Sequence, residues 1–209
     1  MKLFLASLAS QTLDLVLPLL TDKPQNLRLA FIPTAADPYP ADNRPWFDGN
    51  YAKLVSMGFL ITIYDLKAKD KQVLSDDLSQ FDIIYVEGGN TYYLLNEVKK
   101  SGFDSVIKQL LETGIVYIGS SAGSCIMCPT VDHARLIEHP ELVTELTDYT
   151  ALGLIDKCIL PHFGKEKYVE RQAKIIEEWG DKLLPLRDDQ AVIVNDDETK
   201  IVTTNNAKI

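Results

Sequence analysis

The sequence is poor in cysteine and histidine and has no long apolar run, and each shortage narrows the possible functions. Three cysteines in 209 residues are too few, and an odd number, for a disulfide framework, so we expect a reducing, cytoplasmic environment. No stretch of 18 or more apolar residues occurs, which argues against a membrane-spanning helix. Lysine and arginine total 21 against 30 acidic residues, and the resulting formal net charge of −9 disfavours nucleic-acid binding.

The apolar residues that are present follow the pattern of an α/β protein. The composition is 46% hydrophobic and 24% charged, which is typical of a folded globular domain. Apolar runs that suit strands cover residues 2–6, 27–32, 60–64, 81–86, 114–118, 158–160, 191–195 and 200–204, and amphipathic segments that suit helices cover residues 11–20, 46–57, 91–99, 103–112 and 165–179. We therefore expect residues 1–209 to form one three-layer domain, with a mainly parallel sheet covered by helices on both faces.

Two glycine-rich segments follow predicted strands, at the ends where parallel sheets bind their ligands. The first reads Gly-Gly-Asn-Thr over residues 88–91, and the second reads Gly-Ser-Ser-Ala-Gly over residues 119–123. Consecutive glycines allow the backbone N–H groups of Gly88 and Gly89 to approach a substrate closely. A tight turn into a helix capped by Asn90 or Thr91 is an equal alternative.

The second segment matches the pattern Gly-x-Ser-x-Gly, which places a nucleophilic serine on a sharp turn between a strand and a helix. The turn crowds the backbone two residues before and two residues after the serine, so both positions favour glycine. This geometry selects Ser121 rather than Ser120 as the nucleophile, and it directs the N–H group of Ala122 toward a developing oxyanion. A glycine- and serine-rich turn without chemistry is the alternative.

A serine hydroxyl needs a base, and the sequence offers three histidines. His162 follows an apolar segment and precedes a predicted helix, so we expect it at the edge of the sheet, either as the base or as a core or cap residue. His133 and His139 lie among charged residues in an irregular part of the chain, and we expect both on the surface. Cys125 and Cys128 have the spacing of a redox pair; we expect buried thiols on one helix, with a thiol-based sensor as the weaker alternative.

Three segments, in this order and spacing, resemble the dipeptidase E (aspartyl dipeptidase) family of serine peptidases, which is related to cyanophycinase: IIYVEGGNTYYLL, IVYIGSSAGSCIMCPT and LGLIDKCILPHF. The resemblance spans about residues 27–190 and implies a flavodoxin-like fold similar to class I glutamine amidotransferases. It implies that Ser121 is the nucleophile and His162 the base, and that the N–H groups of Gly89 and Ala122 form the oxyanion hole. The implied activity is cleavage of dipeptides or short peptides, typically after an N-terminal Asp, without a metal or cofactor.

The resemblance also implies a third, orienting carboxylate in a segment that follows the base. Asp188 is the first candidate and Asp189 the second, whereas Asp132 lies close to another position proposed for this acid but out of register. An acid beside the histidine would fix its tautomer and stabilise its protonated form. A simple turn residue before the last strands is an equal interpretation of Asp188.

Substrate-binding residues are expected around these groups. Gly88, Asn90 and Arg171 are the candidates, because backbone donors and a guanidinium suit a peptide with an acidic side chain. Arg171 is also compatible with a solvated helix position. Glu87 stands where a glycine is common in the family, and we expect it to narrow the pocket. The alternative function is a catalytically degenerate small-molecule-binding or stress protein of the same fold, and the sequence leaves both a monomer and a homodimer open.

Overall fold

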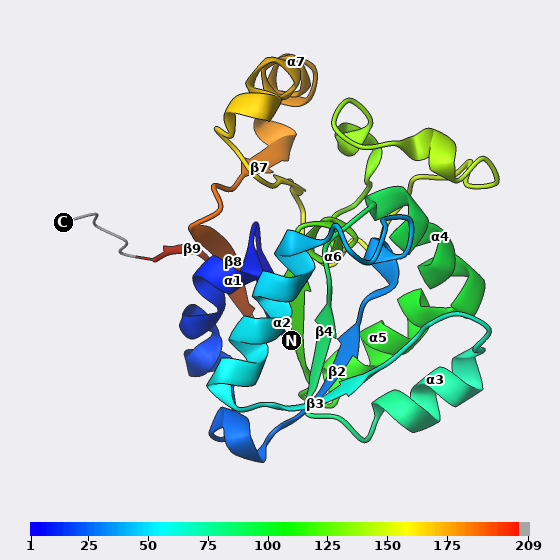
Figure 1. Ribbon diagram of the computed structural model, residues 1–209, viewed down its shortest axis with the longest axis vertical. Coiled ribbons are helices and arrows are strands. Elements are labelled where there is room, and N and C mark those ends of the chain that lie inside the picture. The colour runs from blue at the N-terminus through cyan, green and yellow to red at the C-terminus, as the bar shows by residue number, and fades with distance from the viewer. Residues whose placement is uncertain (205–209) are drawn as a thin grey trace.

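The computed structural model describes residues 1–204, and its centre is a seven-stranded sheet (Figure 1). The strands lie side by side in the order β3-β2-β4-β5-β1-β8-β9. Their bounds are β1 (Lys2–Ala6), β2 (Arg28–Ile32), β3 (Leu60–Ile63), β4 (Ile83–Val86), β5 (Val116–Ser120), β8 (Gln190–Asn195) and β9 (Glu198–Thr203). Non-consecutive neighbours such as β5 and β1 show that the chain crosses over the sheet between strands, as parallel pairing requires.

Five strands run parallel and the last two run antiparallel. Strands β3, β2, β4, β5 and β1 pair in parallel, so all five end at the same edge of the sheet. Strand β8 pairs antiparallel with β1 and begins where β1 ends, with Ala191 opposite Ala6. The residues just before β8 therefore arrive at the edge where the parallel strands end. The predicted α/β class is confirmed, with the expected terminal hairpin as an antiparallel margin.

Side chains of the central strands alternate between two apolar layers. Leu3 and Leu5 of β1 pack into one buried cluster, and Phe4 and Ala6 pack into the other. Helices α1 (Ala9–Thr12) and α2 (Pro45–Met57) contribute to the second cluster. Helices α3 (Lys71–Leu78), α4 (Thr91–Ser101) and α5 (Phe103–Glu112) contribute to the first. The sheet is thus buried on both faces, which explains why its strands are nearly continuous apolar runs.

Two helices differ from the sequence-based expectation. The segment expected as one helix over residues 11–20 forms the short α1 followed by a 3₁₀ helix, Leu13–Leu19, which contains Pro18. Proline lacks the N–H group that an α-helix interior needs, which accounts for the irregular turn. Helix α3 was not expected, and its start signal is Asp70, whose carboxylate accepts a hydrogen bond from the Val73 N–H at 3.0 Å.

A second, two-stranded sheet lies beyond the carboxyl edge of the main sheet. Strand β6 (Cys158–Leu160) pairs in parallel with β7 (Leu183–Pro185), a strand that was not expected. Helix α7 (Val169–Trp179) connects the two strands and lies at the top of Figure 1. Strand β6 was expected in the main sheet and is instead part of this separate layer. The main sheet and the small sheet therefore face one another across the edge where ligands of α/β proteins bind.

The thiols and the surface follow from the same packing. Cys125 on α6 (Ala122–Cys125) and Cys128 just beyond it are fully buried and form no disulfide, as expected, and burial raises the pKa of both thiols. No helix within residues 1–204 is long and apolar enough to cross a membrane.

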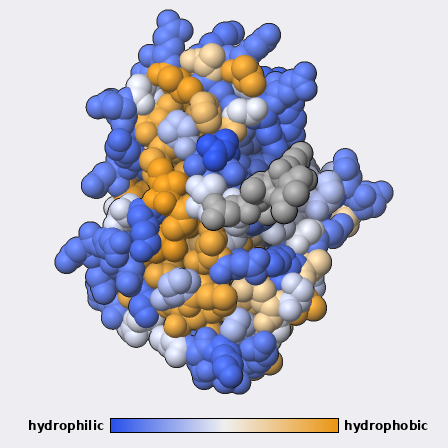
Figure 2. All heavy atoms as spheres, turned by 90° about the vertical axis from the view of Figure 1, so that its left-hand side faces the viewer, coloured by the Kyte–Doolittle hydropathy of each residue, from blue (hydrophilic) through white to orange (hydrophobic). Residues whose placement is uncertain are grey.

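Figure 2 shows a band of apolar residues on the side of the molecule that carries α1 and β9. The β9 edge beside it carries charged Glu198 and Lys200, which oppose unwanted strand pairing.

The cap of α3 gives a prediction about stability. Replacing Asp70 by Ala removes the acceptor for the Val73 N–H group, and we expect the unfolding free energy to fall by about 1 kcal/mol. Urea denaturation would measure this loss as a lower midpoint with an unchanged slope. Asp70→Asn is the matched control, because it keeps the cap and should stay close to the wild type. Equal losses in both variants would show that the charge of Asp70, and not its cap, stabilises the helix.

Candidate active site

Ser121 stands on a strained turn at the carboxyl end of β5. Its backbone has φ 48° and ψ −106°, a conformation that L-residues rarely adopt. A Cβ atom at Gly119 would lie 2.5 Å from the Gly123 carbonyl oxygen, and one at Gly123 would lie 2.2 Å from the Val86 carbonyl oxygen. Positions 119 and 123, two residues before and after Ser121, must therefore both be glycine. The reason is the backbone crowding that the sequence pattern predicts. Ser120 is buried and its hydroxyl accepts hydrogen bonds from the Ala9 N–H and the Asn50 side chain, whereas the Ser121 hydroxyl contacts His162.

The turn after β4 approaches Ser121 from the neighbouring strand. Gly89 has φ 153°, and a Cβ atom there would lie 2.0 Å from the Ala35 carbonyl oxygen, so the position excludes other residues. The indole N–H of Trp46 donates to the Gly88 carbonyl at 3.3 Å and holds the turn from α2. Within residues 1–204 the N–H groups of Gly89 and Ala122 donate no hydrogen bond. Two backbone donors beside one hydroxyl are the arrangement that an oxyanion requires.

His162 reaches Ser121 from the small sheet. It follows β6 in a left-handed conformation with φ 57°, and its Nε2 lies 3.1 Å from the Ser121 Oγ. The buried side chain of Gln172 on α7 fixes this turn, because its amide donates to the His162 carbonyl at 3.0 Å and accepts from the Gly164 N–H. The structure thus brings together two residues 41 positions apart, from two different sheets.

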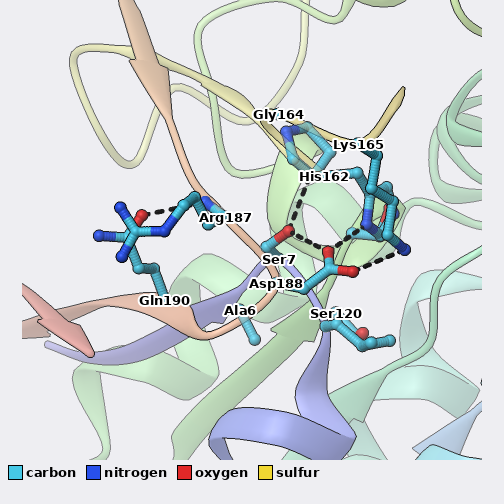
Figure 3. A network of polar contacts seen from close by, with 12 residues as sticks. Ala6, Ser7, Ser120, His162, Gly164, Lys165, Arg187, Asp188 and Gln190 are labelled. Atoms are coloured by element: carbon cyan, nitrogen blue, oxygen red, sulfur yellow. Dashed lines mark hydrogen bonds and ion pairs between the residues drawn. The ribbon is translucent and has the colours of Figure 1, made fainter. Parts of the chain in front are cut away.

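Asp188 completes a chain of hydrogen bonds (Figure 3). Its Oδ1 lies 2.6 Å from Nδ1 of His162, which orients the imidazole and favours the tautomer with a proton on Nδ1. The Ser7 hydroxyl donates to the same oxygen at 3.1 Å and accepts from the His162 backbone N–H at 2.7 Å. Lys165 Nζ lies 2.6 Å from the other oxygen, Oδ2. Asp188 precedes the antiparallel β8, which is why it arrives at the edge where β1 ends and Ser7 follows.

The electrostatics of Asp188 favour its ionised form. Burial by itself would raise the pKa of the Asp188 carboxyl, but hydrogen bonds from His162 and Lys165 outweigh burial and hold this pKa well below its usual range. The two other acids weighed from the sequence lie elsewhere. Asp189 pairs with Arg187 at 3.1 Å, and Asp132 pairs with Arg135 at 3.1 Å. Only Asp188 of these three hydrogen-bonds His162.

A cavity of about 680 Å³ opens beside Ser121 and His162. Its walls include Gly88, Gly89 and Arg171 among the predicted residues, together with Tyr39, Trp46, Glu138, Lys165, Lys167 and Tyr168. Within residues 1–204 no cluster of three or more His, Cys, Asp or Glu side chains could hold a metal ion. The lining combines aromatic faces with charges of both signs, which suits a small polar ligand.

Two predicted positions are corrected by this geometry. Asn90 is fully buried and does not line the cavity, because its side chain caps α4 by accepting from the Tyr93 N–H at 2.8 Å. His133 was expected on the surface but is buried, with Nε2 2.7 Å from the Ile159 carbonyl and its ring edge-on to Trp179. His139 is exposed, as expected. His133 is buried because the irregular segment that carries it packs against β6. Its charged neighbours in the sequence led to the wrong prediction of a surface position.

Glu87 has a role that the sequence did not indicate. It was expected to narrow the pocket, but it is fully buried below the glycine turn and does not line the cavity. Its Oε1 accepts from the Gly88 N–H at 2.6 Å and from the Asn50 side chain at 2.7 Å. Asn50 also donates to the Ser120 Oγ at 3.2 Å. Glu87 and Asn50 therefore link the turns that carry Gly88 and Ser121. The position of an acidic residue directly after an apolar strand could have indicated a buried Glu87. The sequence does not show that its partner is Asn50 on α2.

Comparison with known proteins gives consistent matches. The sequence matches the model of peptidase family S51 over residues 3–202. It is 34% identical over 206 residues to an uncharacterized peptidase of Pasteurella multocida, covering 98% of each chain. It is 31% identical to peptidase E of Salmonella arizonae, over 72% of this chain and 62% of that protein. The crystal structure of a candidate peptidase E protein from Listeria monocytogenes EGD-e superposes with a TM-score of 0.88 at 29% identity, covering 97% of this chain and 98% of that one.

The burial of Glu87 predicts a pH-dependent stability. Burial raises the pKa of this carboxyl to about 8, while hydrogen bonds from Gly88, Asn50 and Tyr85 oppose the rise. A folded-state pKa above the unfolded value of 4.5 means that Glu87 stabilises the fold fully below pH 4.5 and loses this contribution as the pH rises through about 8. The expected slope is on the order of 1.4 kcal/mol per pH unit between these values.

Urea unfolding of the wild type and Glu87→Gln between pH 5 and pH 8 would measure this effect. Glutamine keeps an acceptor for Gly88 and Asn50 but cannot ionise, so the variant should lose stability less steeply as the pH rises. Parallel stability curves for the two proteins would contradict the assignment of a neutral, buried acid at position 87.

Proposed function

Because the chain belongs to peptidase family S51, we propose that it is a serine-type peptidase that cleaves dipeptides or short peptides through an acyl-enzyme. One observation carries this proposal: Ser121, His162 and Asp188 form a continuous chain of hydrogen bonds that opens into the cavity. Nucleophile, base and orienting acid are the three parts that such a reaction needs. The resemblance of this chain to peptidase E proteins points to the same chemistry.

In the first half of the proposed reaction, Ser121 attacks the peptide carbonyl. His162 accepts the hydroxyl proton at Nε2, which already lies 3.1 Å from the Oγ. Asp188 stabilises the imidazolium that forms through its contact with Nδ1. The oxyanion lies between the N–H groups of Gly89 and Ala122, which have no competing partner among the residues the structure describes.

In the second half, the leaving amine takes the proton from His162 and departs, leaving an ester on Ser121. Water then attacks this ester while His162 again serves as base, and the acid product is released as the Ser121 hydroxyl is restored. The strained turn suits both steps, since it holds the Oγ clear of the sheet and fixed toward the imidazole.

The walls of the cavity support a charged peptide as substrate. Arg171 on α7 lines the cavity and forms no ion pair within the described part of the chain, so its guanidinium is free to bind a carboxylate. Glu138 is the acidic side chain on the lining; burial raises the pKa of its carboxyl, and two hydrogen bonds from Thr91 oppose the rise. We propose that Arg171 holds the acidic side chain of an N-terminal Asp, with the α-ammonium group directed toward Glu138.

Replacing Ser121 tests the chemistry. Ser121→Ala removes the nucleophile, and we expect kcat for a cleaved dipeptide to fall at least about 10³-fold with little change in stability. Ser120→Ala is the matched control, because Ser120 is buried and hydrogen-bonded to the backbone, and its activity should stay within about tenfold. Undiminished hydrolysis by Ser121→Ala would remove the mechanism. Ligand binding without hydrolysis in the wild type would favour a degenerate binding protein.

Replacing Arg171 tests the substrate class. Arg171→Met should raise KM for dipeptides with an N-terminal Asp by about 10- to 100-fold, because the carboxylate loses its charged partner. The same variant should cleave dipeptides with an N-terminal Ala as the wild type does. Lys174→Met, on the exposed surface of the same helix, is the control for the loss of one positive charge. An equal rise in KM for both substrates would contradict a role in recognising Asp.

A further inference from the structure

Lys165 forms an ion pair with Asp188 in the candidate site, and the mechanism above does not use it. Its Nζ lies 2.6 Å from Oδ2 of Asp188, while His162 occupies Oδ1 at the same distance (Figure 3). The carboxylate is therefore shared between an imidazole and an ammonium group. Lys165 follows His162 by three residues, and its backbone N–H donates to the His162 carbonyl at 3.1 Å, so both side chains leave one tight turn.

We propose that Lys165 is a positioning residue that fixes Asp188 and sets the pH range over which His162 works as a base. The proposal rests on the proposed function, because it concerns the same three residues. It adds a fourth side chain whose charge acts on His162 through Asp188. It also gives a role to a basic residue in the segment after the histidine, where the sequence pointed to Arg171 for substrate binding.

Lys165 is the cation bound to the carboxylate that contacts His162, while Lys167, Arg171 and Glu138 line the same cavity as His162. Ser121 contacts Nε2, Asp188 contacts Nδ1, and the Tyr168 ring lies tilted by 30° with its centre 6.1 Å from that of the imidazole. Ser7 and Gln172 contact the backbone of His162 and carry no charge. The remaining charges near Asp188 compensate one another, since Arg187 pairs with Asp189. The ammonium group of Lys167 lies over the Tyr168 ring at 4.5 Å.

The sign of the effect follows from the charges. Asp188 alone would favour a protonated imidazole, because it would carry an uncompensated negative charge beside Nδ1. Lys165 partly neutralises that charge from the other oxygen, which weakens the attraction between Asp188 and a protonated imidazole. The acid limb of the pH profile is the range in which kcat/KM rises as His162 loses its proton. We expect this limb at lower pH with Lys165 than without it.

The distance between Lys165 and Asp188 and the exposure of their side chains limit the size of the expected shift in pH. The lysine side chain is 43% exposed and the aspartate side chain 14%, so solvent screens the interaction in part. We expect removal of the lysine charge to move the acid limb of kcat/KM toward alkaline pH by about 0.5 to 1 unit. Holding Asp188 in place is the second role, and its loss would broaden the orientation of the imidazole.

The experiment compares Lys165→Met, Lys165→Arg and the control Lys99→Met. Lys99 forms a surface ion pair of similar length with Asp148, 2.7 Å, so the control removes one charge in the same way but outside the site. The first readout is the pH profile of kcat/KM on a cleaved dipeptide. The second is the titration of the His162 imidazole followed by nuclear magnetic resonance, with its signal assigned by its loss in His162→Gln.

The proposal predicts that both readouts move to higher pH by about 0.5 to 1 unit in Lys165→Met, return toward the wild type in Lys165→Arg, and stay unchanged in Lys99→Met. An unmoved titration in Lys165→Met would overturn it. A rise in KM for acidic dipeptides with an unmoved titration would also overturn it and make Lys165 a substrate ligand. The resonance titration needs no peptidase activity, so a wild type that hydrolyses no peptide would refute the proposed function while this readout still judges Lys165.

Discussion

Three positions without side chains allow the site to exist. At Gly89, Gly119 and Gly123 a Cβ atom would lie 2.0 to 2.5 Å from a backbone oxygen of another segment, closer than any real side chain can approach. Gly89 lets the turn after β4 pack against Ala35 after β2, Gly119 lets the turn after β5 close on itself, and Gly123 lets α6 pack against the end of β4. That packing places the Ser121 hydroxyl beside the N–H groups of Gly89 and Ala122, which donate to no acceptor among residues 1–204. Any larger residue would separate the turns before it affected the chemistry.

The second constraint is the polar joint between the two sheets. His162 follows β6 of the small sheet, whereas Ser7 and Ser121 follow β1 and β5 of the main sheet, and Asp188 precedes the antiparallel strand β8. Ser7 contacts both His162 and Asp188, so the hydroxyl at the end of β1 fixes the position of the small sheet relative to the main one. A buried polar group is stable only when it is hydrogen-bonded, and each member of this joint has its partners. Several hydrogen bonds acting together restrict the position of the His162 side chain more than any single bond would.

The sequence predicted what depends on local pattern and missed what depends on distant partners. The α/β class follows from the pattern of apolar runs. The choice of Ser121 follows from the small residues that its sharp turn requires. Asp188 remained one of several acids in the sequence, because only the antiparallel direction of β8 brings it to the right edge. His133 was misplaced because its partner is the carbonyl of Ile159, 26 residues away. Glu87 depends on Asn50 of α2, and no local signal connects them.

Covalent labelling by a fluorophosphonate probe tests the central claim most directly, because it requires a hydroxyl that is both accessible and activated. Intact mass and peptide mapping would locate the adduct, and the rate would be followed in the wild type and in His162→Gln. The geometry predicts a single adduct on Ser121 that forms at least about 100-fold more slowly without the imidazole. A wild-type protein that stays unlabelled at every pH, or equal labelling rates with and without His162, would contradict it.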